Sequence, residues 1–139
     1  MPRPRIRNPD AAEALVAVAP LATRWIERLL AGHEPALTVP QYLVLRAIAR
    51  EELSGSELAR RAGVSGPAVS QLLGALVDAG LVERIPLAED RRRQALALSR
   101  VGERAYRSAE ALLRARIGAL LADLPHPEAE ALTRLLAHV

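Results

Sequence analysis

Residues 57–72 have the pattern of two short helices joined by a tight turn, and the pattern depends on three small residues. Ala59 lets two helices cross closely, Gly63 can take the positive φ angle of the turn, and Val69 packs back from the second helix onto the first. Any short helical hairpin could show the same spacing, so the pattern indicates a helix-turn-helix without proving one. The rest of the small shared core would be Leu58, Ala62, Val64 and Leu72.

Two short apolar runs follow the second helix, and they predict a β-hairpin. The runs are Leu81 to Ile85 and Gln94 to Leu98, separated by a polar, charged loop from Pro86 to Arg93. A helix-turn-helix followed at once by such a hairpin is a winged helix, in which one helix enters the major groove of DNA and the wing reaches the backbone or the minor groove. The alternative interpretation of the charged tip is a solvated charge run. The tip consists of Glu89, Asp90, Arg91, Arg92 and Arg93.

Capping residues and helix breakers divide the first part of the chain. Asn8 suits the start of a helix that ends at Gly32, and Pro20 is expected to kink or split this helix. Thr38 predicts the cap of a second helix. A capping box with the S-x-x-E spacing starts a third helix over residues 54–63.

The same signals divide the second part. Ser65 caps the second helix of the helix-turn-helix, and Gly80 ends it. Beyond the hairpin, a long amphipathic helix is expected from Ser99 to about Leu124, where a Pro-His-Pro segment breaks it. Residues 128–139 form a last short helix. Its inward-facing residues would be Leu132, Leu135 and Leu136.

The sequence therefore predicts a mainly α fold with a small β-hairpin wing. A flexible Arg/Pro arm covers residues 1–8, and residues 9–139 form one domain, which suits the length of 139 residues. The winged helix-turn-helix spans about residues 37–99, and helices at about 9–31 and 100–139 flank it. These terminal helices carry larger apolar stripes than a small winged-helix core can cover, which indicates a dimer interface. The alternative is a closed monomeric bundle.

Composition excludes several kinds of chemistry. The 19 basic residues are all Arg, and without Lys there is no P-loop lysine and no Schiff base. Without Cys there is no disulfide, no thiolate nucleophile and no Cys-ligated metal. No nucleophile elbow or HExxH motif is present, so we expect no enzymatic activity and no cofactor. Metal sensing is not expected either, because the three histidines, His33, His126 and His138, stand far apart.

The beginning of the chain superficially resembles a secretory signal. Arg3, Arg5 and Arg7 precede an apolar run, but Asp10 and Glu13 interrupt the transition. No stretch approaches the ~18 apolar residues of a membrane span. We expect a soluble, cytoplasmic protein that does not bind membranes.

Three stretches of the sequence resemble the MarR (multiple antibiotic resistance regulator) family of transcription factors. They are LTVPQYLVLRAI, SGSELARRAGVSGPAVSQLLGALVDAGLVER and EDRRRQALALSRVGERA, and they cover residues 37–105. The D-x-R of the family's wing falls on Asp90 and Arg92, and its LS..G pattern falls on Leu98, Ser99 and Gly102. The resemblance implies that Arg92 enters the minor groove while Asp90 holds the wing or a neighbouring Arg in place.

The resemblance also implies a homodimer that binds double-stranded DNA at a pseudo-palindromic operator. We expect this homodimer to act as a repressor. The terminal helices would form the dimer, with two recognition helices about 34 Å apart, one turn of DNA. The alternative function is a winged-helix module for protein–protein contact that does not read DNA sequence.

The predicted recognition helix departs from a common family pattern, because it contains no Arg and its one charge is Asp78. Gln71 is able to pair with adenine, and Pro67 or Ala68 is able to touch a thymine methyl group. Backbone amides near Ser65 and Gly66 would meet a phosphate. The alternative for Ser70 and Gln71 is plain exposed helix surface. Affinity would then depend on Arg60, Arg61, Arg84, Arg91, Arg92 and Arg93, which would contact phosphates or the minor groove.

A pocket for a small molecule between the terminal helices and the DNA-binding part is a further implication of the resemblance. The candidates are Trp25, Arg28, Tyr42 and Arg46, since a ring beside a guanidinium suits a small aromatic or anionic effector. The alternative for the two rings is ordinary core packing. The Cys-based peroxide sensing of part of the family is excluded.

Overall fold

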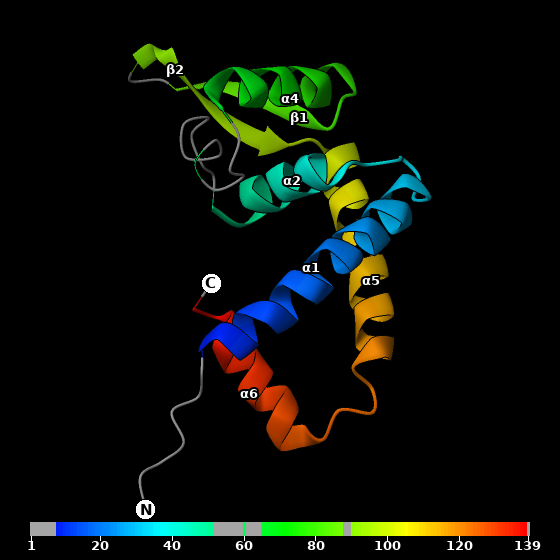
Figure 1. Cartoon of the computed structure of the whole chain (residues 1–139). Helices are drawn as coiled ribbons and strands as arrows, with labels where there is room; N and C mark the ends of the chain where they lie inside the picture. Colours follow the sequence, from blue (N-terminus) through cyan, green and yellow to red (C-terminus); the bar gives the residue numbers. More distant parts are fainter. Residues whose placement is uncertain (1–7, 52–59, 61–64, 88–89, 139) are drawn as a thin grey trace, which may run out of the picture.

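A computed structural model of the chain describes residues 8–51, 60, 65–87 and 90–138. It has the predicted mainly α architecture with one antiparallel hairpin (Figure 1). The predicted third helix, residues 54–63, lies outside the described residues apart from Arg60. The elements are α1 (Asn8–Ala31), α2 (Val39–Glu51), α4 (Gly66–Asp78), β1 (Val82–Leu87), β2 (Asp90–Leu98), α5 (Arg100–Leu120) and α6 (His126–Leu136).

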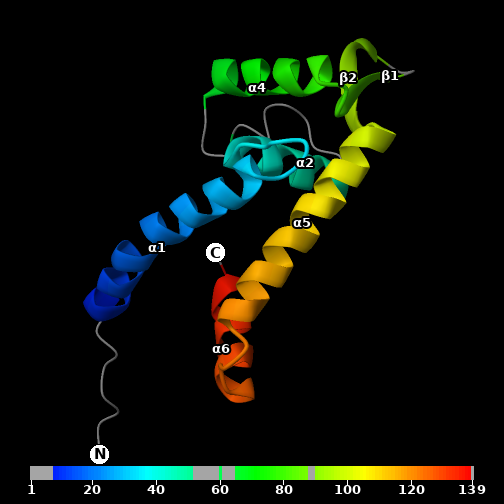
Figure 2. The same ribbon diagram turned by 90° about the vertical axis from the view of Figure 1, so that its right-hand side faces the viewer.

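The elements form a lobe and an arm. Helix α4 and the hairpin lie at one end of the molecule with α2 beneath them, and this group is called the lobe below (Figure 1). Helices α1 and α5 lead away from the lobe, and α6 follows α5 at the far end (Figure 2). These three helices are called the arm.

The hydrophobic core lies where α2 crosses α5 beneath α4 and the hairpin. Tyr42 and Tyr106 meet there with ring centroids 6.1 Å apart, and Ala109 is fully buried beside them. Of the arm, the last turns of α1 and the part of α5 as far as Leu113 contribute buried residues to this core. The largest fully buried side chains are Leu30, Val44, Leu45, Leu76 and Val82.

Two predicted helix caps, at Thr38 and Ser65, are confirmed, and a third cap lies at Ser99, the predicted start of the long helix. The Ser65 hydroxyl accepts a hydrogen bond from the backbone N–H of Ala68 at 3.3 Å, and the Ser99 hydroxyl accepts one from Gly102 at 3.0 Å. Thr38 forms a reciprocal capping box, because the side chain of Gln41 also accepts from the Thr38 N–H at 2.9 Å. These local bonds fix the starts of α2, α4 and α5.

The predicted hairpin loop is too long, because both strands continue into it. Strand β1 extends to Leu87 and β2 begins at Asp90, so most of the expected loop is strand. Pro86 pairs with Gln94 while Leu87 pairs with Asp90, and residues 91–93 of β2 lie between these two pairs as a bulge. A bulge inserts extra residues without ending the ladder, which periodicity alone does not reveal.

The helix ends also differ in part from the prediction. Helix α1 continues through Pro20 without being split, since the carbonyl that loses its partner belongs to Val16, on an exposed part of the helix. Helix α5 ends at Leu120, earlier than expected, and Pro127 lies in the first turn of α6, where proline is tolerated. In the part of the chain that the structure describes, no helix is both long and apolar enough to cross a membrane.

The predicted inward face of the last helix is wrong for the single chain. Leu135 and Leu136 are 70% and 59% exposed, Leu132 is half-buried, and α6 buries no residue within the described chain. In the first half of α1, Leu15 and Val18 are 65% and 59% exposed. The arm of a single chain is therefore not a closed bundle.

Replacing Gly102 by Ala is expected to destabilise the fold. A Cβ atom at this position would lie 1.9 Å from the carbonyl oxygen of Leu81, which is backbone and cannot rotate away. We expect a loss of about 2–3 kcal/mol or more in the free energy of unfolding, as in other overpacked sites. Urea denaturation measures it.

Gly118→Ala is the matched control in the same helix, because a Cβ there meets nothing within 4 Å. It should stabilise the protein by about 0.5–1 kcal/mol through helix propensity. Equal stability of Gly102→Ala and the wild type would contradict the described contact between α5 and the start of the hairpin.

Candidate nucleic-acid interface and ligand cavity

Helix α4 has one buried face and one exposed face. Val69, Leu73 and Leu76 are buried, and the helix packs on α2 and β1. The N-terminal half turns its other residues to solvent, and none of them is charged. The structure therefore brings the predicted base-reading residues together on one exposed surface. They are Ser65, Gly66, Pro67, Ala68, Ser70 and Gln71, and this set is called the α4 face.

The predicted phosphate-binding arginines are only partly described. Arg60 and Arg84 are exposed, and Arg84 stands on β1 opposite Leu96. Asp90 and residues 91–93 belong to β2 at the bulge, next to the tip of the hairpin. Arg61 lies outside the described residues, and so do three arginines near the start of the chain, Arg3, Arg5 and Arg7.

A compact joint holds α4, the hairpin and α5 together. Gly80 has a φ of +74°, a conformation that favours glycine, and its carbonyl accepts a 2.5 Å hydrogen bond from the Ser99 hydroxyl. The carbonyl of Leu81 accepts from the Ser99 N–H at 3.1 Å, and the Leu81 N–H donates to Leu76 at 2.9 Å. These bonds set the orientation of the α4 face and the hairpin relative to α5.

A cavity of about 420 Å³ lies between α1, α2 and α5. Of the predicted pocket residues, Tyr42 and Arg46 line this cavity, whereas Trp25 and Arg28 are not among its described lining residues. Trp25 is half-buried and Arg28 is exposed, and Ile26 takes the place on α1 that was expected for Trp25. The remaining lining residues are Val39, Leu43, Glu110, Leu113, Arg114 and Ile117.

The prediction missed the contribution of α5 to this cavity. Glu110 and Arg114 are four residues apart, and so are Leu113 and Ile117, so both pairs lie along one side of the helix. The sequence signal for this contribution is an acidic and a basic residue, Glu110 and Arg114, beside the apolar stripe of the long helix.

The carboxylate of Glu110 gathers three guanidinium groups. Its Oε1 atom lies 3.2 Å from Arg50, 3.6 Å from Arg46 and 3.7 Å from Arg114. The Glu110 side chain is only 18% exposed, while each of the three Arg side chains is at least 42% exposed. One negative charge therefore stands among three positive charges at the junction of α2 and α5.

Opposing effects act on the pKa of Glu110. Partial burial raises this pKa, but the Tyr106 hydroxyl, the Arg50 guanidinium and the charge of Arg114 together outweigh burial and lower it. The pKa of Arg50 is raised, first by Tyr106 and then by Glu110. Both partners of this contact therefore stay charged at neutral pH.

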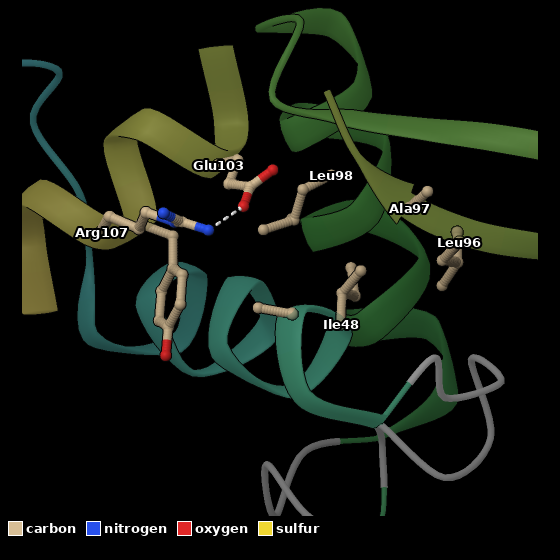
Figure 3. A pocket seen from close by; sticks show the side chains of 8 residues that line it. Ile48, Leu96, Ala97, Leu98, Glu103 and Arg107 are labelled. Atoms are coloured by element: carbon tan, nitrogen blue, oxygen red, sulfur yellow. Dashed lines mark hydrogen bonds and ion pairs between the residues drawn. The ribbon is translucent and has the colours of Figure 1, made fainter. Parts of the chain in front are cut away.

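A second cavity of about 280 Å³ lies between α2, β2 and the start of α5. Figure 3 shows Ile48 and Leu98 beside it, and at its edge Glu103 and Arg107 form a 2.6 Å ion pair. Tyr106 lines this cavity and also interacts with Glu110 of the first one, so a single turn of α5 connects the two.

Among the described residues, no group of three or more His, Asp or Glu residues is placed so that it could hold a metal ion. His33 instead bonds to the Ser108 hydroxyl at 2.8 Å and to the carbonyl oxygen of Pro35 at 2.9 Å. The contact with Ser108 ties the turn after α1 to α5.

Glu110→Gln should lower stability at neutral pH and have little effect in acid. Because the pKa of Glu110 is lowered on folding, its carboxylate stabilises the folded state above the unfolded pKa, and this contribution is lost as pH falls below about 4. Urea denaturation at neutral pH and near pH 3 compares the variant with the wild type. A deficit that is equal at both pH values would show that the charge of Glu110 does not matter.

Comparison with known proteins identifies the family. The model of the MarR family matches residues 37–93. The HTH-type transcriptional repressor Rv2887 of Mycobacterium tuberculosis is 35% identical over 101 residues, which is 72% of this chain and 73% of that protein.

Solved structures agree with this match. Mycobacterium tuberculosis Rv2887 in complex with salicylic acid has a TM-score of 0.73 and 30% identity, covering 90% of this chain and 92% of that one. The MarR family transcription regulator SP03579 has a TM-score of 0.80 at 20% identity, covering 93% and 85%, and shows the shared fold. The chain belongs to the MarR family of transcription regulators.

Proposed function

We propose that this protein is a sequence-specific DNA-binding repressor that acts in the cytoplasm as a homodimer on a pseudo-palindromic operator. The observation that carries the proposal is the α4 face, an exposed helix surface without charged groups that lies beside an arginine-bearing hairpin. Such a surface can enter the major groove without repulsion from phosphates, while arginines beside it supply the attraction. The family relationship supports this function, since a curated relative is a transcriptional repressor.

The two parts of the surface have different roles in this proposal. Gln71 and Ser70 read base edges from the α4 face, and Pro67 or Ala68 contacts a thymine methyl group. The first amides of α4, near Gly66, meet a phosphate. Contacts to phosphates and the minor groove come from Arg60, Arg61, Arg84, Arg91, Arg92 and Arg93, with Asp90 holding the wing.

The exposed apolar residues of the arm support a dimer. Leu21 and Leu120 are 71% and 69% exposed in the single chain, on two different helices of the arm. Apolar surface on several neighbouring elements indicates an interface, and a second copy offers an identical surface in a two-fold arrangement. The helices at about residues 9–31 and 100–139 would form it. Further exposed members are Leu15, Val16, Val18, Leu121, Leu135 and Leu136.

The cavity between α1, α2 and α5 supports control by a small molecule. Its volume of about 420 Å³ lies in the range of ligand pockets, and its walls combine apolar side chains with Arg46 and Arg114. A guanidinium beside the ring of Tyr42 suits a small aromatic carboxylate. The relative Rv2887 was solved with salicylic acid and with p-aminosalicylic acid.

Arg92→Ala should weaken binding to the DNA upstream of the gene and reduce its salt dependence. Loss of one backbone or minor-groove contact lowers the slope of log affinity against log salt by about 1. Fluorescence anisotropy at several salt concentrations measures both quantities. Arg134→Ala is the control, because Arg134 is exposed on α6 at the far end of the arm. Unchanged affinity and unchanged slope for Arg92→Ala would remove the wing from the proposal.

Gln71→Ala tests base reading. It should relax sequence preference, so that the ratio of affinities for upstream DNA and for shuffled DNA falls by about tenfold, the effect of one bidentate base contact. The salt slope should stay that of the wild type, because no phosphate contact is lost. A lower slope with an unchanged affinity ratio would mean that Gln71 does not read bases.

A further inference from the structure

Glu110 has an unusual place in the cavity between α1, α2 and α5. It is the acidic residue among the described lining residues, and two of its three arginine partners, Arg46 and Arg114, line the cavity with it. The third partner, Arg50, is not among the lining residues. Three members of the ion cluster, Glu110, Arg46 and Arg114, therefore line the cavity, and Arg50 does not.

The three ion pairs differ in length. Arg50 lies within hydrogen-bond distance of Glu110 at 3.2 Å, and the angle is suitable. Arg46 and Arg114 lie at 3.6 and 3.7 Å, too far for a good hydrogen bond. Their guanidinium groups are attracted to Glu110 by charge, but their N–H groups are not satisfied by it. A carboxylate in the cavity could accept hydrogen bonds from both.

The three pairs also connect different parts of the molecule. Arg46 and Arg50 belong to α2, which packs on α4 and β2 in the lobe, whereas Glu110 belongs to α5 in the arm. Their pairs with Glu110 therefore join lobe to arm. Arg114 lies one turn from Glu110 on the same helix, so the ion pair between them does not connect the lobe to the arm.

We propose that Glu110 couples ligand binding to the DNA-binding lobe, because a ligand carboxylate held by Arg46 and Arg114 competes with Glu110 for Arg46. The inference rests on the proposed function and adds the residue through which a ligand acts. Competition weakens the attraction between α2 and α5, so the ligand favours a lobe position different from that of the free protein. A ligand shifts such an equilibrium only through different interactions in the two states, and Arg46 supplies that difference.

The charge of Glu110 also limits ligand affinity. A negative group next to the cavity disfavours a second negative group there. Removing this charge should therefore tighten binding of an anionic ligand and at the same time disconnect binding from the lobe. A residue with a purely structural role would not produce these two opposite effects together.

The decisive variant is Glu110→Gln, with salicylate as the probe. Fluorescence of the single Trp, Trp25, gives the dissociation constant of salicylate, and anisotropy gives the affinity for upstream DNA with and without saturating salicylate. We expect Glu110→Gln to bind salicylate at least about threefold more tightly, from relief of charge repulsion. The ratio of DNA affinities without and with salicylate, called the coupling ratio, should fall toward one.

Glu103→Gln is the matched control, since it removes an acid that pairs with Arg107 on the same helix and that is not among the lining residues of this cavity. It should leave salicylate affinity and the coupling ratio unchanged. Arg114→Gln should weaken salicylate binding but keep the coupling ratio at saturation, because the pairs between lobe and arm remain. Arg46→Gln should weaken salicylate binding and also lower the coupling ratio at saturation, because the competition passes through Arg46, and it serves if Glu110→Gln does not fold.

The outcomes separate the inference from the proposed function. If the wild type responds to salicylate and Glu110→Gln responds equally, or binds salicylate more weakly, the inference is overturned and ligand control stands. If the wild type does not bind salicylate but Glu110→Gln does, this form of ligand control fails while the limiting charge of Glu110 is supported. If neither binds, both are overturned.

Discussion

The packing of α2 across α5 is the contact on which the rest of the structure depends. Small residues at Ala105 and Ala109 let the two helices approach, and the pair of Tyr42 and Tyr106 fills the crossing. On one side of this crossing α2 supports α4 and the hairpin, and on the other side α5 continues into the arm. The ion cluster around Glu110 and the larger cavity both lie along the same crossing, so any change there reaches the lobe and the arm together.

Charge is distributed unevenly over the lobe. The α4 face carries no charge, and the hairpin next to it carries arginines at positions 84 and 91–93. The joint formed by Gly80, Leu81 and Ser99 fixes these two surfaces relative to each other through backbone and hydroxyl hydrogen bonds. In the proposed repressor, attraction to DNA and reading of its sequence are thus assigned to different parts of one surface.

Local signals predicted the local structure well. The caps at Thr38, Ser65 and Ser99 depend on one side chain and a backbone amide three residues away, so the sequence is enough to find them. The exposed face of α4 follows from helical periodicity in the same way. The cavity lining depends instead on how α1 turns toward α5, and for this reason the sequence points to Trp25 although Ile26 lines the cavity. The sequence predicts an inward face for the last helix because its apolar stripe suits packing on the chain's own core. Within one chain, however, Leu135 and Leu136 face solvent.

In the proposed dimer, two copies of the α4 face read DNA one helical turn apart while the hairpins hold the flanking backbone. Hydroxyl-radical footprinting and methylation interference on the DNA upstream of the gene test this directly. We expect two major-groove segments with interfering guanine or adenine positions, centred about 10 base pairs apart, with protected backbone outside each. A single contacted segment, or protection that does not depend on sequence, would contradict it.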